Sequence, residues 1–368
     1  MNFKLSKTEL LKSLQKINRI IPARSTLPIL SCVLFEIKNN ILKLRATDLE
    51  QSIMIEIDVN SDNEGVFAIS VKTLLEITQE IPSESLSISV TPNNKVEIKT
   101  DFGNYTIMGK NAKEFPETPV IENPVKVDMS KEELNDIIQD TLYAASKDEM
   151  KISLQGVCIN IEKRNVVAVA TDGFRLVKRT SKFKGNNDYS GQVIIPSKFL
   201  NVLQSHLSKG DLSLMLSVNH IQVENDKMTL ISRIIREKYP DYESIIPSDS
   251  DKIAVVDKNY LLSAVKRVSI FSNRTTKQIA LTFEKNKLVV TTEDPENITS
   301  GYEEISCKYN EELIKIGFNA NYLKEILTHQ SSEEVFIKLK SSLAAAMIIP
   351  KDENLSKELL SLLMPIRI

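Results

Sequence analysis

Apolar and polar positions alternate along this chain in two rhythms that recur together. In "FKLSKTELLKSLQKI" the apolar residues Leu10, Leu11, Leu14 and Ile17 fall at helical spacing, which predicts an amphipathic helix. The stretch that follows, "LPILSCVLFEIKNNILKLRATDLE", alternates apolar and polar residues and predicts half-buried antiparallel strands. The sequence therefore opens with a short strand, a helix and two strands.

The same order of elements occurs three times. The second copy is "VKVDMSKEELNDIIQD" followed by "ISLQGVCINIEKRNVVAVATDGFR", and the third is "IAVVDKNYLLSAVKRV" followed by "KQIALTFEKNKLVVTTEDPE". Each copy ends its strands in Thr, an acidic residue and a turn, at Thr47, Thr171 and Thr292. Equal spacing of such units is the signature of an internal repeat.

Capping residues mark two helix starts in every repeat. Ser6 with Glu9, and Ser130 with Glu133, match the capping box, in which Ser accepts a free helical N–H and Glu returns the bond. The six predicted helix starts are Ser6, Ser70, Ser130, Ser197, Asp257 and Asn319. Chance similarity of amphipathic segments explains one match, but not a regular series of six helix-plus-strands units.

This repeat predicts an α+β fold of three tandem domains, each with two helices packed on antiparallel sheets. Pro and polar residues cluster at 120–128 and 245–254, as in linkers, and place the domains at 1–124, 125–249 and 250–368. Three such domains in series would carry six helices on one face of a curved rod. Their exposed strand edges need a partner, and a head-to-tail contact with a second copy would close a six-domain ring.

Composition indicates the cellular setting. The 368 residues are 42% hydrophobic and 26% charged, which is ordinary for a globular protein. The apolar run at 343–349 is far shorter than the roughly 20 residues of a membrane helix, and the N-terminus lacks a signal-peptide core. Cys32, Cys158 and Cys307 are isolated, without disulfide or zinc spacing, which suggests a reducing cytoplasm.

The formal net charge of −2 argues against nucleic-acid binding only if charge is evenly spread. The face of the first helix opposite its apolar stripe carries Lys7, Lys12, Lys16 and Arg19. A local basic stripe of this kind is what a phosphate backbone would meet.

No catalytic constellation stands out, and no cofactor or metal is expected. The chain lacks phosphate-binding glycine motifs, and His206, His220 and His329 have no metal-ligand spacing. Asp172 precedes Gly173 after a strand, so a turn-forming Asp-Gly is favoured over a catalytic acid. The competing hypothesis is a repeat-built enzyme or ligand-binding protein with Asp172 and Arg175 in its site. It explains "TDGFRL" alone.

The C-terminal "ELLSLLMPIRI" is unusually apolar for a chain end. One interpretation is a last edge strand folded onto its own core. The other is that these residues form the wall of a groove for a binding partner.

Several stretches resemble the bacterial DNA polymerase sliding clamp family, the beta subunits of the replicative DNA polymerase III. They are "LPIL" at 27–30, "TDGFRL" at 171–176, "YPDY" at 239–242 and the terminal "MPIRI", and the resemblance spans the whole chain. It implies a head-to-tail homodimeric ring of six domains around duplex DNA, without enzymatic activity, in the cytoplasm at the nucleoid. It also implies tethering of the polymerase alpha subunit, clamp loader, repair polymerases, mismatch repair proteins and ligase, with no membrane partner.

The resemblance also implies a peptide-binding groove between the second and third domains, in which Arg175 and Arg367 would fix the peptide's polar ends. The matching positions are Leu154, Thr171, Gly173, Phe174, Arg175, Leu176, Pro240, Ser244, Ile245, Leu362, Met364, Pro365, Ile366, Arg367 and Ile368. Phe174 stands where the family often has histidine and Ser244 where a basic residue is common, so the groove is less polar on that side. Residues 351–360 are slightly longer than usual.

The remaining matches concern DNA and the second copy. Arg24, Lys72 and Lys198 match basic positions of the family, and Lys12 belongs to the basic helix face; a solvated surface is the alternative for each lysine. For ring closure the matches are Tyr105 and Ile107 at one end, and Ile270 and Phe271 at the other. For the last two, a place in the core of the third repeat is the alternative.

Overall fold

The structure, a computed structural model, describes all residues except 183–188, 206, 208–211, 226 and 353–357. It has two compact units. One comprises Met1–Lys131 with Asn201–Ile234, and the other Glu132–Leu200 with Ile235–Ile368. No helix among the described residues is long and apolar enough to cross a membrane.

In the described part of the chain, six α-helices begin at or directly after the predicted capping residues. They are α1 (Lys7–Ile17), α2 (Val71–Glu80), α3 (Lys131–Thr141), α4 (Ser197–Gln204), α5 (Lys258–Val268) and α6 (Ala320–Thr328). Ser6 accepts from Glu9 N at 3.4 Å, and Asp257 from Tyr260 N at 2.9 Å. Ser70 precedes α2 but its side chain makes no capping hydrogen bond.

Short 3₁₀ turns link the helices and strands. They are η1 (Pro28–Ser31), η2 (Ala112–Glu114), η3 (Leu142–Ala144), η4 (Ile152–Leu154), η5 (Glu243–Ile245) and η6 (Ser269–Phe271).

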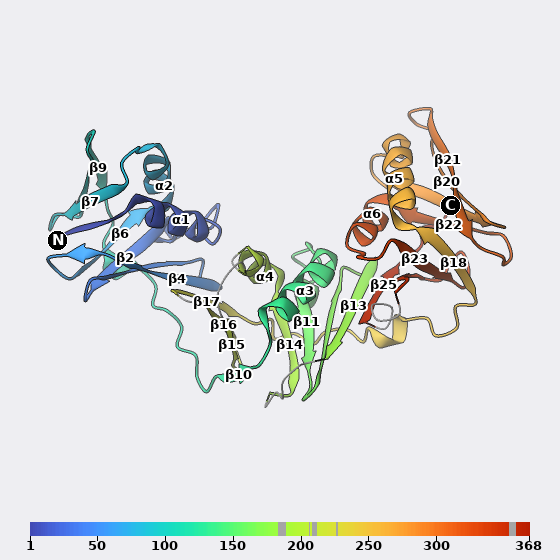
Figure 1. The fold of residues 1–368 in the computed structure, drawn as a ribbon, viewed down its shortest axis with the longest axis horizontal. Helices are drawn as coiled ribbons and strands as arrows, with labels where there is room; N and C mark the ends of the chain where they lie inside the picture. Colours follow the sequence, from blue (N-terminus) through green and yellow to red (C-terminus); the bar gives the residue numbers. More distant parts are fainter. Residues whose placement is uncertain (183–188, 206, 208–211, 226, 353–357) are drawn as a thin grey trace. The chain divides into compact units, whose positions relative to one another are not determined.

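The first unit contains two antiparallel sheets and the helices α1 and α2, which lie side by side (Figure 1). The five-stranded sheet runs β5 (Asn60–Ser61), β1 (Asn2–Ser6), β7 (Ser85–Val90), β8 (Lys95–Lys99), β9 (Asn104–Met108). The eight-stranded sheet runs β10 (Val125–Val127), β15 (Ser213–Leu216), β16 (His220–Asn225), β17 (Met228–Arg233), β4 (Gln51–Asp58), β3 (Ile41–Thr47), β2 (Cys32–Lys38), β6 (Gly65–Ser70).

The second unit contains one twelve-stranded sheet. Its order is β14 (Gly191–Pro196), β11 (Gly156–Ile161), β12 (Asn165–Thr171), β13 (Arg175–Lys182), β25 (Leu359–Leu363), β24 (Ala346–Pro350), β23 (Glu334–Leu339), β18 (Lys252–Asp257), β21 (Thr299–Lys308), β20 (Lys287–Asp294), β19 (Gln278–Glu284), β22 (Ile314–Asn319). Helices α5 and α6 pack together in this unit, and residues such as Leu261, Val265, Leu323 and Ile326 fill its core.

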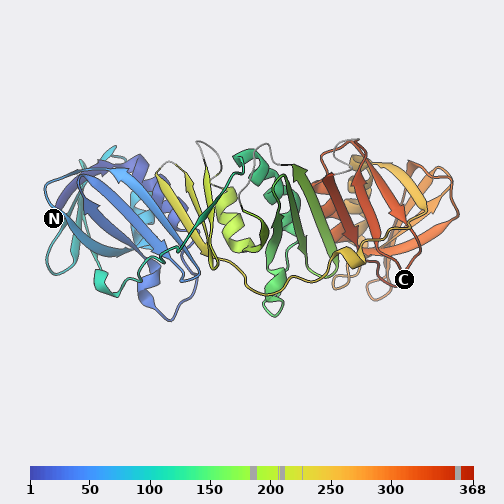
Figure 2. The same cartoon turned by 90° about the horizontal axis from the view of Figure 1, so that it is seen from below.

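Sheets continue from one repeat into the next by pairing of two distant strands. In the first unit β4 pairs with β17, and in the second β13 pairs with β25. Figure 2 shows both pairings as abrupt changes of colour between neighbouring strands. The first pairing joins the first repeat to the second half of the second repeat. The other joins the first half of the second repeat to the third repeat, so three repeats form two compact units.

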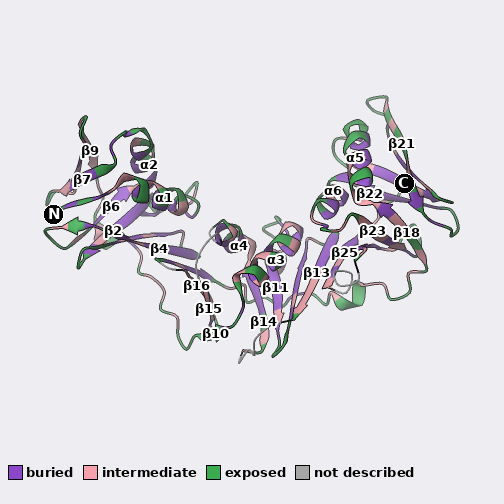
Figure 3. Cartoon of the chain, in the orientation of Figure 1, coloured by how far each residue is buried: buried purple, intermediate pink, exposed green. Residues whose placement is uncertain are grey.

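Burial follows the predicted alternation, with buried faces between helices and sheets and exposed turns (Figure 3). The turn of the third repeat differs from expectation. β20 continues to Asp294, which accepts from Glu296 N at 3.2 Å and from Asn297 Nδ2 at 2.7 Å, so Asp294 forms this turn rather than Glu293. The last strand also differs: β25 lies between β13 and β24 and is not an edge strand.

Candidate functional site

The turn between β12 and β13 is built by Thr171 and Asp172. Thr171 Oγ1 donates to Arg175 O at 2.6 Å and accepts from Gly173 N at 3.0 Å. Asp172 Oδ1 accepts from Phe174 N at 2.9 Å and Arg175 N at 3.0 Å. Gly173 has a φ of 94°, which favours glycine. The prediction of a turn-forming Asp172 is confirmed.

Arg175 is buried beside this turn. Its side chain is 6% exposed, and Nε donates to Asp172 Oδ2 at 3.2 Å while Nη2 donates to Tyr143 O at 2.7 Å. Nη1 pairs with Glu325, and Cζ lies 4.8 Å from the ring centroid of Tyr322. The contacts occupy the guanidinium group within its own unit, and the expected role of Arg175 at the polar end of a peptide remains a prediction. They connect β13 to α6 and hold the turn in place.

Phe174 and Met364 form an apolar pair at the surface. Phe174 is 54% exposed and Met364 is 41% exposed, and Met364 N donates to Phe174 O at 2.9 Å. The Phe174 ring stacks on Tyr322 with centroids 5.9 Å apart, and Lys151 Nζ lies 5.4 Å from its centroid. The sequence did not single out Tyr322 or Lys151, because the fold alone brings their elements to this turn. In the sequence, Tyr322 is marked only by its position just after the predicted helix start at Asn319.

Three predicted groove residues are buried in the core of the same unit. Leu154, Leu176 and Leu362 belong to one apolar cluster, together with Tyr239 and Met347. Because these side chains are buried, they offer little surface to a partner.

Pro240, Ser244 and Ile245 lie on the surface of the same unit, at or near η5. An ion pair of 2.6 Å between Lys178 Nζ and Glu243 Oε1 links η5 to β13. Ser244 Oγ donates to the backbone of its own turn, so the serine has a local role as a donor. The 3₁₀ turn thus presents Ile245, which is 49% exposed, on a segment linked to β13.

The last residues leave β25 and turn back onto β22. Ile366 N donates to Gly317 O at 2.8 Å, and Gln278 Nε2 donates to Arg367 O at 3.3 Å. Pro365 is half-buried between these contacts and Phe174. The tail is therefore held at both ends.

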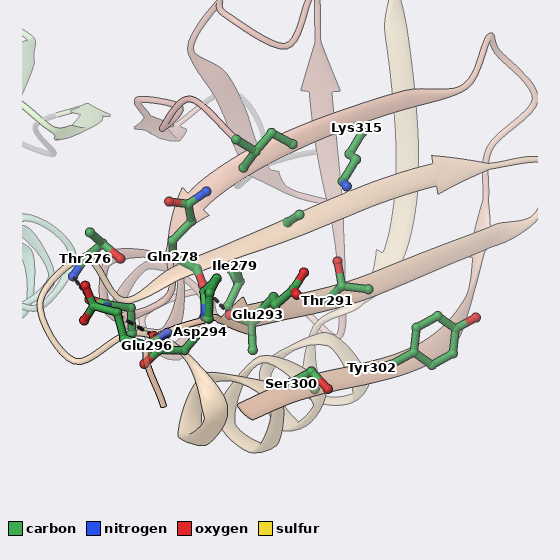
Figure 4. Close-up of a pocket in the computed structure, with 16 residues that line it drawn as sticks. Thr276, Gln278, Ile279, Thr291, Glu293, Asp294, Glu296, Ser300, Tyr302 and Lys315 are labelled. Atoms are coloured by element: carbon green, nitrogen blue, oxygen red, sulfur yellow. Dashed lines mark hydrogen bonds between the residues drawn. The ribbon is translucent and has the colours of Figure 1, made fainter. Parts of the chain in front are cut away.

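A pocket of about 770 Å³ opens on the sheet beside the tail (Figure 4). Polar side chains of β19 to β22, among them Gln278, Thr291, Glu293 and Lys315, line it, and Ile368 contributes from the tail. Of the predicted groove residues, only Ile368 lines this pocket.

The predicted DNA-contacting residues lie on or near helices. Lys12 on α1, Lys72 on α2 and Lys198 on α4 are exposed, as is Arg24 before η1. Burial, and then the charge of Lys12, lower the pKa of neighbouring Lys16.

The third repeat carries basic residues that the sequence did not single out. Burial lowers the pKa of Lys324, and so do the charges of Lys277 and Lys266. The ammonium groups of Lys266 on α5, Lys277 before β19 and Lys324 on α6 are therefore close enough to repel one another. The spacing along the chain, 266, 277 and 324, hides this cluster.

Two of the predicted dimer contacts lie on an outer strand and the other two in a 3₁₀ turn. Tyr105 and Ile107 are half-buried on β9, the last strand of the five-stranded sheet. Ile270 is 75% exposed and Phe271 is 44% exposed in η6, next to β21. The alternative that these two residues belong to the core does not hold.

The described residues contain no cluster of side chains that could hold a metal ion. Cys32, Cys158 and Cys307 are free and buried, and burial raises the pKa of all three, that of Cys158 to about 12.

Comparisons with known proteins identify the class. Models of the DNA polymerase III beta subunit match in order: the N-terminal domain at residues 1–119, the central domain at 128–241 and the C-terminal domain at 243–367. The chain belongs to the DNA polymerase III beta subunit family, the bacterial sliding clamps.

The relatives include the beta sliding clamp of Pseudomonas putida, 28% identical over 351 residues and 95% of both chains. The structure is similar to that of a sliding clamp from Bartonella birtlesii bound to griselimycin, with a TM-score of 0.95, 28% identity and full coverage of both chains. A Pseudomonas aeruginosa sliding clamp with a ligand gives a TM-score of 0.92 at 27% identity, also with full coverage of both chains.

These findings confirm the resemblance, the three α+β clamp domains and the absence of an enzymatic role, since clamps of this family are non-catalytic processivity factors. The assigned contact residues and the domain limits remain predictions.

Proposed function

We propose that this chain is a DNA sliding clamp in which two copies close head to tail into a six-domain ring around duplex DNA. The observation that carries the proposal is the threefold repeat, matched in order by the three clamp-domain models. The clamp works in the cytoplasm on nucleoid DNA. It keeps a polymerase on its template by topology and performs no chemistry.

The basic residues on and near the helices face the DNA. Lys12, Arg24, Lys72 and Lys198 contribute from the first two repeats, and the lysine cluster at α5 and α6 from the third. Contacts between ammonium or guanidinium groups and phosphates hold DNA without reading its sequence. A net charge of −2 is compatible with this role because DNA phosphates respond to the local basic surface and not to the overall charge of the protein.

Ring closure pairs two exposed strand edges from different copies. β9 ends its sheet, and β21 pairs with β20 on one side but meets β18 only through Val255 and Val256 on the other. Pairing β9 of one copy with β21 of the next would satisfy both edges. Tyr105 and Ile107 would then pack against Ile270 and Phe271 of the second copy.

The exposed apolar surface around Phe174, Ile245 and Met364 receives a peptide from each client protein. Clients are the polymerase alpha subunit, the clamp loader, repair polymerases, mismatch repair proteins and ligase. Apolar anchors in such a site carry most of the binding energy. Griselimycin, bound in the Bartonella clamp structure, serves as a probe ligand for the same surface.

The topological mechanism is tested with a clamp loaded onto nicked circular DNA by a clamp loader and separated by gel filtration. The clamp should elute with the circle and be lost once a restriction enzyme linearises it. Equal retention on circular and linear DNA would contradict the proposal.

A further inference from the structure

We propose that Gly317 is a positioning residue for peptide binding, because it allows the C-terminal tail to lie close against β22. The inference rests on the proposed peptide site. It concerns a residue that touches no client itself but fixes Met364–Ile368 beside Phe174.

Each repeat contains the same backbone clasp. The chain returns after its last strand and donates one N–H to the strand that precedes the second helix. The three bonds are Lys110 N to Ala68 O at 2.8 Å, Ile235 N to Ile194 O at 3.0 Å, and Ile366 N to Gly317 O at 2.8 Å. In β6, β14 and β22 alike, the acceptor is the third residue from the end of the strand.

The acceptor is a glycine only in the third clasp. A Cβ at Gly317 would stand 2.5 Å from Ile366 O and 2.5 Å from Ile368 Cγ2, distances that side chains do not tolerate. Ala68 and Ile194 show that the clasp itself accepts a side chain. The glycine is therefore needed for the closer approach of the tail, not for the clasp.

The position of Gly317 on its strand supports this interpretation. Lys315 and Asn319 share its face of β22 and are exposed and half-buried, whereas Gly317 is buried. A residue on the polar face of an outer strand is buried when something lies over it, and the segment in contact is Ile366–Ile368.

The clasp and the apolar pair are only a few residues apart. Met364 N is bonded to Phe174 O, and Ile366 N to Gly317 O, so Pro365 lies between two fixed points. A methyl group on Gly317 would push Ile366 away from β22, and the displacement would reach Met364. We expect the peptide surface to lose its shape while the sheet beneath remains intact.

The experiment compares Gly317→Ala with the wild type by calorimetric titration with griselimycin. We expect about tenfold weaker binding, the effect of losing one hydrogen bond together with apolar contact. Gly65→Ala is the matched control: it also adds a methyl group to an outer strand, but there it meets only the flexible Met1 side chain. The control should bind as the wild type does.

Two further measurements separate positioning from a general loss of structure. The Ile366 amide should be protected from hydrogen exchange in the wild type and lose protection in Gly317→Ala, while amides of β19 keep theirs. In a chain that lacks Met364–Ile368, Gly317→Ala should have no effect on the residual binding.

Wild-type affinity in Gly317→Ala, or an unchanged Ile366 amide, would overturn the proposal. A further loss in the tail-deleted chain would also overturn it, since Gly317 would then act without the tail. If the wild type failed to bind griselimycin while Ile366 stayed protected, the proposed peptide site would be wrong, and the role of Gly317 in binding with it.

Discussion

The chain builds the same junction twice, once in each unit. In the first, Thr47 Oγ1 donates to Gln51 O at 2.8 Å, and Asp48 Oδ1 accepts from Gln51 N at 2.8 Å. The turn from Thr171 to Arg175 repeats these bonds. The strand that arrives from the next repeat is tied identically: Arg233 N donates to Glu50 O, and Met364 N donates to Phe174 O, both at 2.9 Å.

The two junctions differ in the side chains on this common backbone. In the first, Glu50 and Arg233 approach to 3.9 Å as an exposed ion pair. In the second, Phe174 and Met364 occupy the same two positions as an exposed apolar pair. The proposed peptide surface therefore differs from the first junction in its side chains and not in its backbone.

Removing the tail should give the largest effect. Deletion of Met364–Ile368 takes away half of the apolar pair and the residues held by β22. We expect griselimycin or a polymerase-derived peptide to bind at least about a hundredfold more weakly. Light scattering should still give twice the subunit mass, because the residues proposed to close the ring, on β9 and in η6, all remain in the truncated chain. Normal peptide binding by the truncated chain would refute the site.

Arg175 and Gln51 occupy the same place in their turns and both are buried, but only Arg175 carries a charge. Arg175→Ala would leave the carboxylates of Asp172 and Glu325 without their partner, at a cost of about 3 kcal/mol in the free energy of unfolding. Gln51→Ala removes a neutral donor to Asp48 and should cost about 1 kcal/mol. Urea unfolding of both variants measures the difference, and equal losses would argue against a special role for Arg175.

Thr47 and Thr171 share two hydrogen bonds in their turns, but Thr47 has a third. Each hydroxyl donates to the residue four positions on and accepts from the residue two positions on, and the Thr47 hydroxyl also accepts from Ser52 Oγ at 2.9 Å. Thr171→Val should therefore destabilise its unit by about 1–2 kcal/mol, and Thr47→Val by about 1 kcal/mol more, because the buried Ser52 hydroxyl loses its partner. Equal shifts of the unfolding midpoints would show that the third bond contributes nothing.

The smallest expected effect is the chemical reactivity of two thiols, Cys32 in the first unit and Cys158 in the second. Burial raises the pKa of both, that of Cys158 to about 12, so the reactive thiolate is scarce at pH 8. Neither should react with a thiol reagent in the native protein until the pH approaches those raised values or the chain unfolds. Mass spectrometry after brief treatment at pH 8 checks this, and rapid labelling would contradict their burial.

Local patterns along the chain predict the helix starts, the alternation of the strands, the threefold repeat and the turn at Asp172. Local rules fix these features, and they hold in the structure. The pairing of β25 between β13 and β24 was missed, because a strand's neighbours depend on contacts far along the chain. For the same reason the sequence did not reveal Tyr322, Gly317 or the burial of Arg175.

The turn of the third repeat also differs from its sequence pattern, by one residue. Thr292 and Glu293 matched the pattern, yet β20 runs on to Asp294 and Thr292 Oγ1 bonds to Gln278 O instead. The site residues came from the resemblance and not from periodicity. The turn that holds several of these residues, however, belongs to the repeat and can be predicted from it.

The most direct test exchanges the chemistry of the two junctions. The double variant Phe174→Glu with Met364→Arg places the polar pair of the first junction on the backbone of the second. We expect this variant to unfold at nearly the wild-type urea concentration and not to bind griselimycin in calorimetric titration. Binding close to that of the wild type would contradict the claim that this apolar pair makes the peptide site.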